Sequence, residues 1–389
     1  MTENDWDPRA ETVLAYQIDA CDALRRRCPV AHSDYLGWSV LRHEDVMRVL
    51  LDHQTFSSAV SRHPSVPNGM DPPEHTPYRK IIEPYFAADR MQAFEPACRA
   101  IASRLAERLP MDGEIEFMSG FAQDFALEIQ CAFMGWPNTL HEPLREWTRK
   151  NHDATLSGDR ERTAAVAFEF DHHIRKLLDE RRHARDAAGG GMPPDVTTRL
   201  MRERIGDRYL SDEEIVSIVR NWTVGELATI ASSVGIVARY LGERAPLQQR
   251  LRAQPSLLPN AIDEILRIDA PLISNKRRTT RPVELGGREI GTGELVTAIW
   301  ASANRDESVF GDPDEFRPDR SGEQNLLYGA GIHICPGAPL ARLELRIVME
   351  ELLAHTAAFE PSVGKAATRA VYPAGGFSFL PMIIRRRTV

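Results

Sequence analysis

Apolar residues recur every three to four positions along most of this chain, which is the spacing of one face of an α-helix. The pattern predicts helices over residues 90–110, 121–134, 163–183, 212–242, 257–268 and 338–355. Ser211 and Glu214 have the spacing of a capping box, so the longest of these helices is expected to begin at Asp212. With a rise of about 1.5 Å per residue, that helix is long enough to cross a whole domain.

Strand patterns are short and few. Residues 37–41 and 295–300 are apolar and β-prone, and residues 282–290 have the pattern of a hairpin that turns at Gly286 and Gly287. A stretch rich in glycine and proline at 187–195 predicts a loop between helices. The expected fold class is therefore mainly α with a minor antiparallel β component.

Composition narrows the possible functions. The 389 residues carry a formal net charge of -8, which argues against general nucleic-acid binding. No apolar stretch appears long enough to cross a bilayer, and the polar, acidic start lacks the features of a signal peptide. The cysteines at 21, 28, 98, 131 and 335 lie far apart, which suits a reducing cytosol better than a disulfide framework. We therefore expect a cytoplasmic protein without a membrane anchor.

The chain shows no redox module of its own. No Gly-x-Gly-x-x-Gly follows a strand-like run, and the cysteine spacing does not fit an iron–sulfur cluster. A flavin, nicotinamide or ferredoxin domain is therefore not expected. If the protein performs redox chemistry, its electrons come from elsewhere.

The segment with the clearest chemistry reads Tyr-Gly-Ala-Gly-Ile-His-Ile-Cys-Pro-Gly, from Tyr328 to Gly337. Its glycines let the backbone approach a flat macrocycle, and the predicted helix after it points its positive N-terminal end at Cys335. These are the needs of a thiolate ligand to a haem iron. Two other interpretations are a small buried cysteine in a glycine-rich turn and a zinc site. His333 and Cys335 would give zinc only two ligands, and no Cys-x-x-Cys pair completes them.

This segment resembles the haem-binding loop of the cytochrome P450 family, Phe-Gly-x-Gly-x-His-x-Cys-x-Gly. Every specified position matches except the first, where Tyr328 replaces phenylalanine. The resemblance implies a single cytochrome P450 haem domain over residues 1–389. It also implies haem b as the cofactor, with Cys335 as the axial ligand of its iron.

Further family motifs follow in order along the chain. His75 and Arg79 match the family's His-x-x-x-Arg, Arg277 lies where the family has a third basic residue, and His333 belongs to the haem loop. The resemblance assigns these four residues to the haem propionates. A dianionic cofactor buried in protein needs such cations and donors.

A second set of matches implies a structural role. Glu264 and Arg267 fit the family's Glu-x-x-Arg, and Arg320 lies in Phe-Arg-Pro-Asp-Arg, which resembles the downstream partner motif. The resemblance implies an ion network that holds the haem loop in place.

The helix over residues 212–242 departs from the family pattern Ala-Gly-x-Asp/Glu-Thr. Thr229 matches the threonine, but Ala228 replaces the acid, and Glu226 occupies the position of the glycine. Glu226 and Thr229 are three residues apart and would share a face of an α-helix. Three interpretations of Glu226 remain open: it delivers protons from a shifted position, it binds a polar or cationic substrate group, or it is structural.

Pro336 is a second departure. Proline has no N–H, so one possible hydrogen bond to the Cys335 thiolate is missing. A sulfur with fewer hydrogen bonds donates more electron density to iron, so we expect a lower reduction potential.

The function that the resemblance implies is a haem-thiolate monooxygenase. It would insert one oxygen atom from O2 into a small organic substrate, with Thr229 and Glu226 in catalytic roles. Electrons would come from an external ferredoxin and ferredoxin reductase or an equivalent donor. The alternatives are a peroxygenase driven by hydrogen peroxide and a haem-based sensor or carrier without turnover. The resemblance also places Trp222, Gly225, Ile273 and Phe377 near the substrate.

Overall fold

Helices form most of the protein. The computed structural model describes residues 4–61, 63–188 and 194–387. The α-helices are α1 (Glu11–Ala15), α2 (Gln17–Arg27), α3 (His43–Leu51), α4 (His75–Ile82), α5 (Ala88–Glu107), α6 (Gln123–Met134), α7 (His141–Ser157), α8 (Arg160–Ala188), α9 (Val196–Leu200), α10 (Asp212–Val224), α11 (Ala231–Gly242), α12 (Ala245–Ala253), α13 (Leu258–Ile268), α14 (Trp300–Ala303), α15 (Glu307–Phe310) and α16 (Ala338–His355).

The strands are short. They are β1 (Val30–Ser33), β2 (Gly37–Val40), β3 (Phe56–Ser57), β4 (Asp112–Glu116), β5 (Arg204–Ile205), β6 (Arg208–Tyr209), β7 (Asn275–Thr279), β8 (Val283–Leu285), β9 (Arg288–Ile290), β10 (Leu295–Ala298), β11 (Thr356–Pro361), β12 (Thr368–Arg369), β13 (Phe377–Phe379) and β14 (Pro381–Arg386). The largest sheet has the order β1-β2-β10-β7-β3, and a second sheet has the order β11-β14-β4. In the largest sheet, neighbouring strands are antiparallel except β2 and β10, which are parallel.

The predicted fold class is confirmed, and most of the predicted elements lie where the apolar spacing placed them. Residues 338–355 form α16, residues 258–268 form α13, and Ser211 caps α10 through a capping box with Glu214. The hairpin turns at Gly286 and Gly287, which both have the positive φ that a tight turn of this type requires. The prediction for 295–300 was too long, because the strand ends at 298 and Trp300 begins α14. Of the loop predicted at 187–195, residues 189–193 lie outside the described residues.

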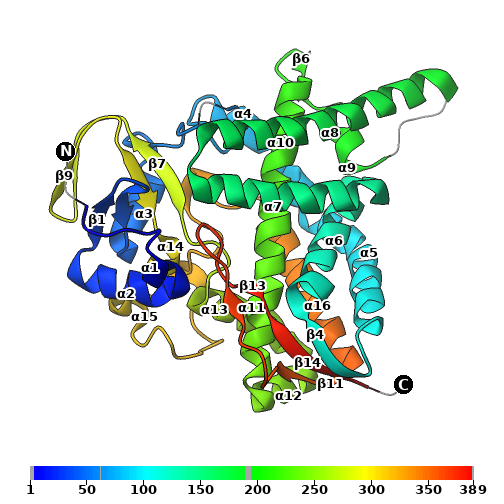
Figure 1. Ribbon diagram of the computed structural model, residues 1–389. Coiled ribbons are helices and arrows are strands. Elements are labelled where there is room, and N and C mark those ends of the chain that lie inside the picture. The colour runs from blue at the N-terminus through cyan, green and yellow to red at the C-terminus, as the bar shows by residue number, and fades with distance from the viewer. Residues whose placement is uncertain (1–3, 62, 189–193, 388–389) are drawn as a thin grey trace.

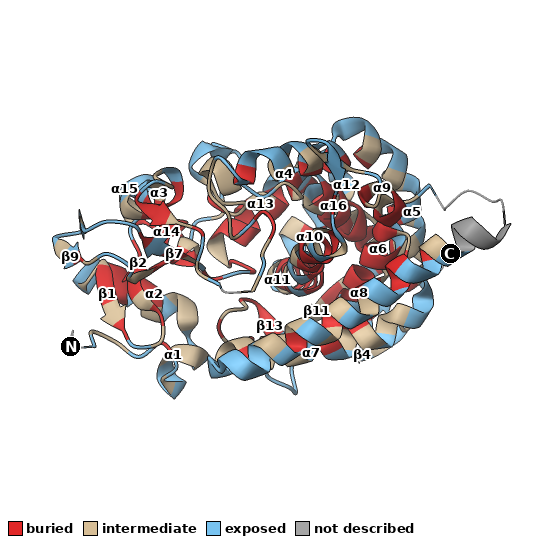
Figure 2. Ribbon diagram, turned by 90° about the horizontal axis from the view of Figure 1, so that it is seen from above, coloured by how far each residue is buried: buried red, intermediate tan, exposed pale blue. Residues whose placement is uncertain are grey.

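One long helix passes through the middle of the molecule. It consists of α10, a π-helical turn η4 (Gly225–Ile230), and α11. Figure 1 shows this helix between the sheet region with α2, α3 and β1 on one side and α5, α6 and α16 on the other. Figure 2 shows that buried residues concentrate along α10, α11, α6 and α16, whereas much of α7 and α8 is exposed. The central helix therefore contributes to both the core and the site.

The same helix corrects one expectation from the sequence. Residues 212–242 are long and apolar enough to cross a bilayer by length and composition. However, 67% of its most apolar window is buried inside the protein. Its apolar character is explained by packing in the protein core.

The segment at residues 64–66 is attached directly to α10. The Arg220 guanidinium donates from Nη2 to the carbonyl oxygen of Pro64 at 2.7 Å and from Nη1 to the Asp171 carboxylate of α8 at 2.5 Å. The Ser217 hydroxyl oxygen accepts from the amide of Val66 at 2.8 Å. Arg220 thus connects α10 to both α8 and this segment.

Candidate haem site

The loop from Tyr328 to Gly337 has a fixed shape because of its glycines. Gly329 and Gly331 have φ of 73° and 71°, in the left-handed region. A Cβ atom on Gly331 would lie 2.6 Å from the carbonyl oxygen of Leu50 at the end of α3. The loop can therefore pack against α3 only with glycine at this position, and it leads directly into α16.

Cys335 lies at the end of this loop with its surface exposed. Its amide donates to the carbonyl oxygen of Tyr328 at 2.8 Å, which holds the turn. Desolvation by the surrounding protein raises the pKa of the thiol, while hydrogen bonds from the amides of Gly337 and Ala338 lower it. The two amides beyond Pro336 therefore supply donors to the sulfur that Pro336 itself cannot supply.

Apolar surface remains uncovered around this loop and on the central helix. Ile334 of the loop is 47% exposed, and Val224 of the central helix is 36% exposed. Gly225 is exposed, and a Cβ atom there would meet no atom within 4 Å. An exposed isoleucine next to an accessible cysteine fits a flat, apolar ligand.

A cluster of basic groups contains the residues that the sequence assigned to the propionates. The rings of His75 and His333 are 4.6 Å apart, and Nε2 of each is buried without a hydrogen-bond partner among the described residues. Burial, with Arg277 and His75, lowers the pKa of His333 to about 3, and burial with Arg79 lowers the pKa of His75. Both rings are therefore neutral at pH 7.

The surroundings of Arg277 suit the binding of an anion. Its side chain is buried, and within the described residues its hydrogen bond goes to the carbonyl oxygen of Lys276 at 2.8 Å, with no carboxylate paired to it. Burial lowers the pKa of Arg277, and the charge of Asp71, which makes no ion pair with Arg277 in the described part of the chain, opposes this. Arg79 is bound to Glu83, Nε to Oε1, at 2.8 Å. A buried guanidinium without a counterion is costly unless an anion binds beside it, so the cluster suits a carboxylate-bearing ligand.

The structure brings Glu264, Arg267 and Arg320 together. Arg267 donates from Nε and Nη2 to the two carboxylate oxygens of Glu264 at 2.8 and 2.9 Å. Arg320 donates from Nε to Oε1 of Glu264 at 3.2 Å. Arg267 also reaches the carbonyl oxygen of Asn304, whose side-chain oxygen accepts from the amide of Leu326. The network therefore leads to the start of the haem loop.

Thr229 and Glu226 both lie in the π-helical turn of the central helix. The Thr229 hydroxyl donates to the carbonyl oxygen of Gly225 at 2.5 Å and is partly exposed. Glu226 is buried, and burial raises the pKa of its carboxyl to about 8. A π turn advances each residue by a smaller angle than an α-helix does, so the shared face expected from α-helical spacing is lost. The two side chains have different surroundings.

The residues assigned to the substrate do not form one cluster. Trp222 packs edge-on against Phe86 with ring centroids 5.1 Å apart, and Gly225 borders open space. Ile273 and Phe377 line a cavity of about 790 Å³ whose walls also include Arg239. Cys335 and Thr229 are not among the lining residues of this cavity.

One buried acid was not identified from the sequence. Glu344 lies in α16 with no exposed surface, among Leu340, Ile347 and Val348 on the apolar side of the helix. A glutamate inside an otherwise apolar stripe is the signal that could have identified it. The charge of the Glu226 carboxylate, after burial, raises the pKa of the Glu344 carboxyl group.

The described residues contain no group of three or more His, Cys, Asp or Glu that could hold a bare metal ion. The zinc interpretation therefore lacks a complete set of ligands among the described residues. An accessible cysteine, uncovered apolar surface, orphaned imidazole nitrogens and an unpaired buried arginine are the features that haem would satisfy.

Comparisons with known proteins point the same way. The family model described as Cytochrome P450 matches residues 236–363. The chain is 31% identical to erythromycin C-12 hydroxylase of Saccharopolyspora erythraea, over 88% of this chain and 87% of that protein. It is 30% identical to linalool 8-monooxygenase of Pseudomonas putida, over 87% and 88%. A solved structure of a P450 EryK mutant in complex with erythromycin B superimposes with a TM-score of 0.86 at 28% identity, covering 96% of this chain and 98% of that one.

Proposed function

Since this chain belongs to the cytochrome P450 family of monooxygenases, which bind haem b through a cysteine thiolate, we propose that Cys335 is that ligand. The observation that carries this proposal is the loop from Tyr328 to Gly337. It presents an accessible sulfur to which the amides of Gly337 and Ala338 donate. When bound, the haem supplies O2 activation and the transfer of one oxygen atom to the substrate.

We propose that His75, Arg79, Arg277 and His333 hold the haem propionates. Neutral imidazole still donates one N–H, and the two orphaned Nε2 atoms need a partner. A propionate near Arg277 would supply the counterion that this buried cation lacks. Glu264, Arg267 and Arg320 keep a structural role, because their charges are already satisfied by one another.

We propose that Thr229 and Glu226 take part in proton delivery. The Thr229 hydroxyl is held by the Gly225 carbonyl oxygen, so its oxygen remains free to accept a hydrogen bond from water. Glu226 has a pKa raised to about 8, so it holds its proton at neutral pH and can act as an acid. The residues of this chain would thus orient water and supply a proton, while the chemistry of oxygen belongs to the cofactor.

We propose that electrons come from an external ferredoxin and ferredoxin reductase, or an equivalent donor, and that the substrate is a small organic molecule. The two relatives are named for erythromycin and linalool, which supports an organic substrate without selecting one. Trp222 and Gly225 lie on the central helix and remain substrate candidates. Ile273 and Phe377 would contact a substrate only if it reaches into the 790 Å³ cavity. The free cysteines suit a cytoplasmic location.

The test of Cys335 is spectroscopic. The reduced carbon monoxide complex of the holoenzyme should show the long-wavelength Soret band of a thiolate-ligated haem, and Cys335→Ala should lose it. Cys28→Ser is the matched control and should keep the band. A Cys335→Ala protein that retains both the band and activity would refute the assignment.

A second experiment separates the monooxygenase from the peroxygenase. Product formation is measured with ferredoxin, ferredoxin reductase and reduced nicotinamide, and separately with hydrogen peroxide alone. We expect turnover only or mainly with the protein donors. Efficient turnover with peroxide alone and none with the donors would favour the peroxygenase.

A further inference from the structure

A buried polar contact joins α6 to the central helix just before the π turn. Nε2 of the Gln130 side chain donates to Oγ1 of Thr223 at 2.8 Å, and the Thr223 hydroxyl donates to the carbonyl oxygen of Val219 at 2.8 Å. Gln130 is 2% exposed, and Thr223 is fully buried. Since α10 ends at Val224 and the π turn begins at Gly225, this contact holds the last turn of α10.

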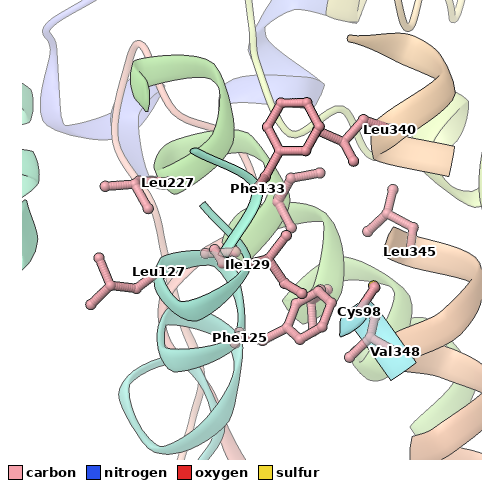
Figure 3. Packing of buried hydrophobic residues seen from close by; sticks show 14 of the residues in the cluster. Cys98, Phe125, Leu127, Ile129, Phe133, Leu227, Leu340, Leu345 and Val348 are labelled. Atoms are coloured by element: carbon pink, nitrogen blue, oxygen red, sulfur yellow. The ribbon is translucent and has the colours of Figure 1, made fainter. Parts of the chain in front are cut away.

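The surroundings of this contact are apolar. Figure 3 shows Leu127, Ile129 and Phe133 of α6 together with Leu227 of the π turn, and all four belong to one buried hydrophobic cluster. Apolar side chains tolerate small sliding movements, whereas a hydrogen bond in such a layer fits one register and is costly to break. The bond from Gln130 therefore fixes the position of the central helix against α6.

Hydroxyl groups hold the other end of the π turn. The Ser233 hydroxyl donates to the carbonyl oxygen of Thr229 at 2.7 Å, and the Ser232 hydroxyl donates to the carbonyl oxygen of Gly375 at 2.6 Å. Both serines are buried. Hydroxyl groups that bond to the carbonyl oxygen four residues earlier, as Ser233 and Thr229 do, compete with backbone amides and bend helices. These bonds therefore favour the wider π turn over a regular α-helix at this place.

The π turn decides where the Thr229 hydroxyl lies. A π turn contains one residue more than the α-helical turn it replaces, so its conversion to α-helix would rotate one half of the central helix against the other by about 100°. Gln130 fixes the half before the turn, and Ser232 attaches the half after it to the chain at Gly375. The two halves are thus held in the relative orientation that the π turn needs.

We propose that Gln130 and Thr223 are positioning residues for Thr229. Their hydrogen bond holds the central helix in the register that keeps the π turn, and the π turn places the Thr229 hydroxyl on the carbonyl oxygen of Gly225. This inference rests on the proton-delivery role proposed for Thr229 and extends it to two buried residues that act only through the helix.

Hydrogen–deuterium exchange of the holoenzyme tests the positioning without turnover. Thr223→Val removes the hydroxyl, and we expect the backbone amides of residues 225–230 to exchange severalfold faster than in the wild type. Thr223→Ser keeps the hydroxyl and should exchange like the wild type. Thr197→Val is the matched control, because the buried Thr197 hydroxyl likewise accepts from Trp136 Nε1 at 2.9 Å and donates to the carbonyl oxygen of Met134 at 2.7 Å. Unchanged exchange at 225–230 in Thr223→Val, or equally fast exchange there in Thr197→Val, overturns the proposal.

The double variant Gln130→Leu with Thr223→Val separates positioning from stability. Because it removes both partners and leaves no unsatisfied donor, urea unfolding should find it more stable than Thr223→Val alone. Product formed per nicotinamide consumed should nevertheless stay severalfold below the wild type, since the register is no longer fixed. A double variant that regains both stability and coupling would show a merely structural contact and overturn the proposal. This variant also serves if Thr223→Val alone fails to fold.

Thr229→Ala distinguishes this inference from the proposed function. We expect lowered coupling in both Thr229→Ala and Thr223→Val, and normal coupling in Thr197→Val. Lowered coupling in Thr229→Ala with normal coupling in Thr223→Val rejects the positioning role and leaves the proposed function intact. Normal coupling in Thr229→Ala rejects the role proposed for Thr229, and the positioning role then fails with it, whatever the exchange at 225–230.

Discussion

The protein buries glutamates in two contrasting ways. Glu264 receives hydrogen bonds from Arg267 and Arg320, and every charge in that network has an opposite partner. Glu226 and Glu344 form no ion pair among the described residues, and no donor reaches Oε1 of Glu226 or either oxygen of Glu344. The first arrangement fixes a carboxylate in one charge state and fixes the chain around it. The second leaves the charge state dependent on a proton, which is unsuitable for a structural anchor and suitable for chemistry.

The largest effect is expected where the paired network is broken. Arg267→Met would leave Glu264 buried with the longer hydrogen bonds from Arg320 and from the amide of Arg317, and the free energy of unfolding should fall by about 3–5 kcal/mol. Urea denaturation of the holoenzyme measures it. Arg149→Met removes an exposed ion pair with Glu146 and should cost about 1 kcal/mol or less. Equal losses of unfolding free energy in Arg267→Met and Arg149→Met would show that the buried network is no more important for stability than an exposed ion pair.

The unpaired acids should make stability depend on pH in a defined direction. The pKa of Glu226 is raised from 4.5 to about 8, so the folded state holds more protons than the unfolded state between these values. Stability from this group is fully present below pH 4.5 and is lost as the pH rises toward 8. The free energy of unfolding should therefore fall over this range.

Glu344→Gln sharpens the same measurement. Removing one of these two acids should flatten the decline and stabilise the protein at pH 8 by about 1–3 kcal/mol, the scale for relieving one poorly paired buried group. Glu350→Gln should retain the decline of the wild type, because Glu350 is bound to Arg346. A wild type whose stability does not change from pH 5 to 8 would show that Glu226 is not protonated.

Cys335 is an intermediate case, since its sulfur accepts hydrogen bonds from two backbone amides and also lies within the influence of the Arg79 charge. Pro336→Leu adds a third backbone donor beside Gly337 and Ala338. A hydrogen bond to a charged group is worth about 1.5–3 kcal/mol, and it favours the more negative ferrous state, so the reduction potential should rise. Redox titration followed by the Soret band measures it. An unchanged or lower potential with the loop intact would refute the argument.

The smallest effect on stability is expected for the uncharged, buried hydroxyl group of Tyr328. The Tyr328 hydroxyl is buried without a partner among the described residues. Tyr328→Phe removes it and keeps the ring that lies under the Arg342 guanidinium at 4.5 Å. Thermal or urea unfolding should show a gain of about 1 kcal/mol or less. A clear loss of stability would mean that the hydroxyl has a partner in the holoenzyme.

Features set by neighbouring residues were predictable from the sequence. The capping box at Ser211, the hairpin at Gly286 and Gly287, and the apolar period of α16 each depend on a few adjacent positions. The haem loop is equally local, because its glycines and Cys335 lie within ten residues. The parallel pairing of β2 with β10 was missed because the two strands are more than 250 residues apart in sequence.

The two unpaired acids show the same limit within the site. Glu226 attracted notice by its position, but Glu344 is on another helix, and no local pattern connects them. Glu226 and Thr229 lie in a π turn, and the α-helical spacing used for their expected relation does not apply there. Ile273 and Phe377 were placed near the substrate by resemblance, whereas the structure puts them around a cavity that excludes Cys335.

The contacts of Arg220 have a consequence for how this edge of the protein opens. One guanidinium holds both the Pro64 carbonyl oxygen and Asp171 of α8, so its two hydrogen bonds share a single rigid plane. Moving α8 away from the central helix would shift the Arg220 guanidinium and strain its hydrogen bond to Pro64. Moving the 64–66 segment would likewise strain the hydrogen bond between Arg220 and Asp171 of α8. Opening of the protein at this edge is therefore a cooperative event, in which two surface elements are released together rather than by independent loop motions.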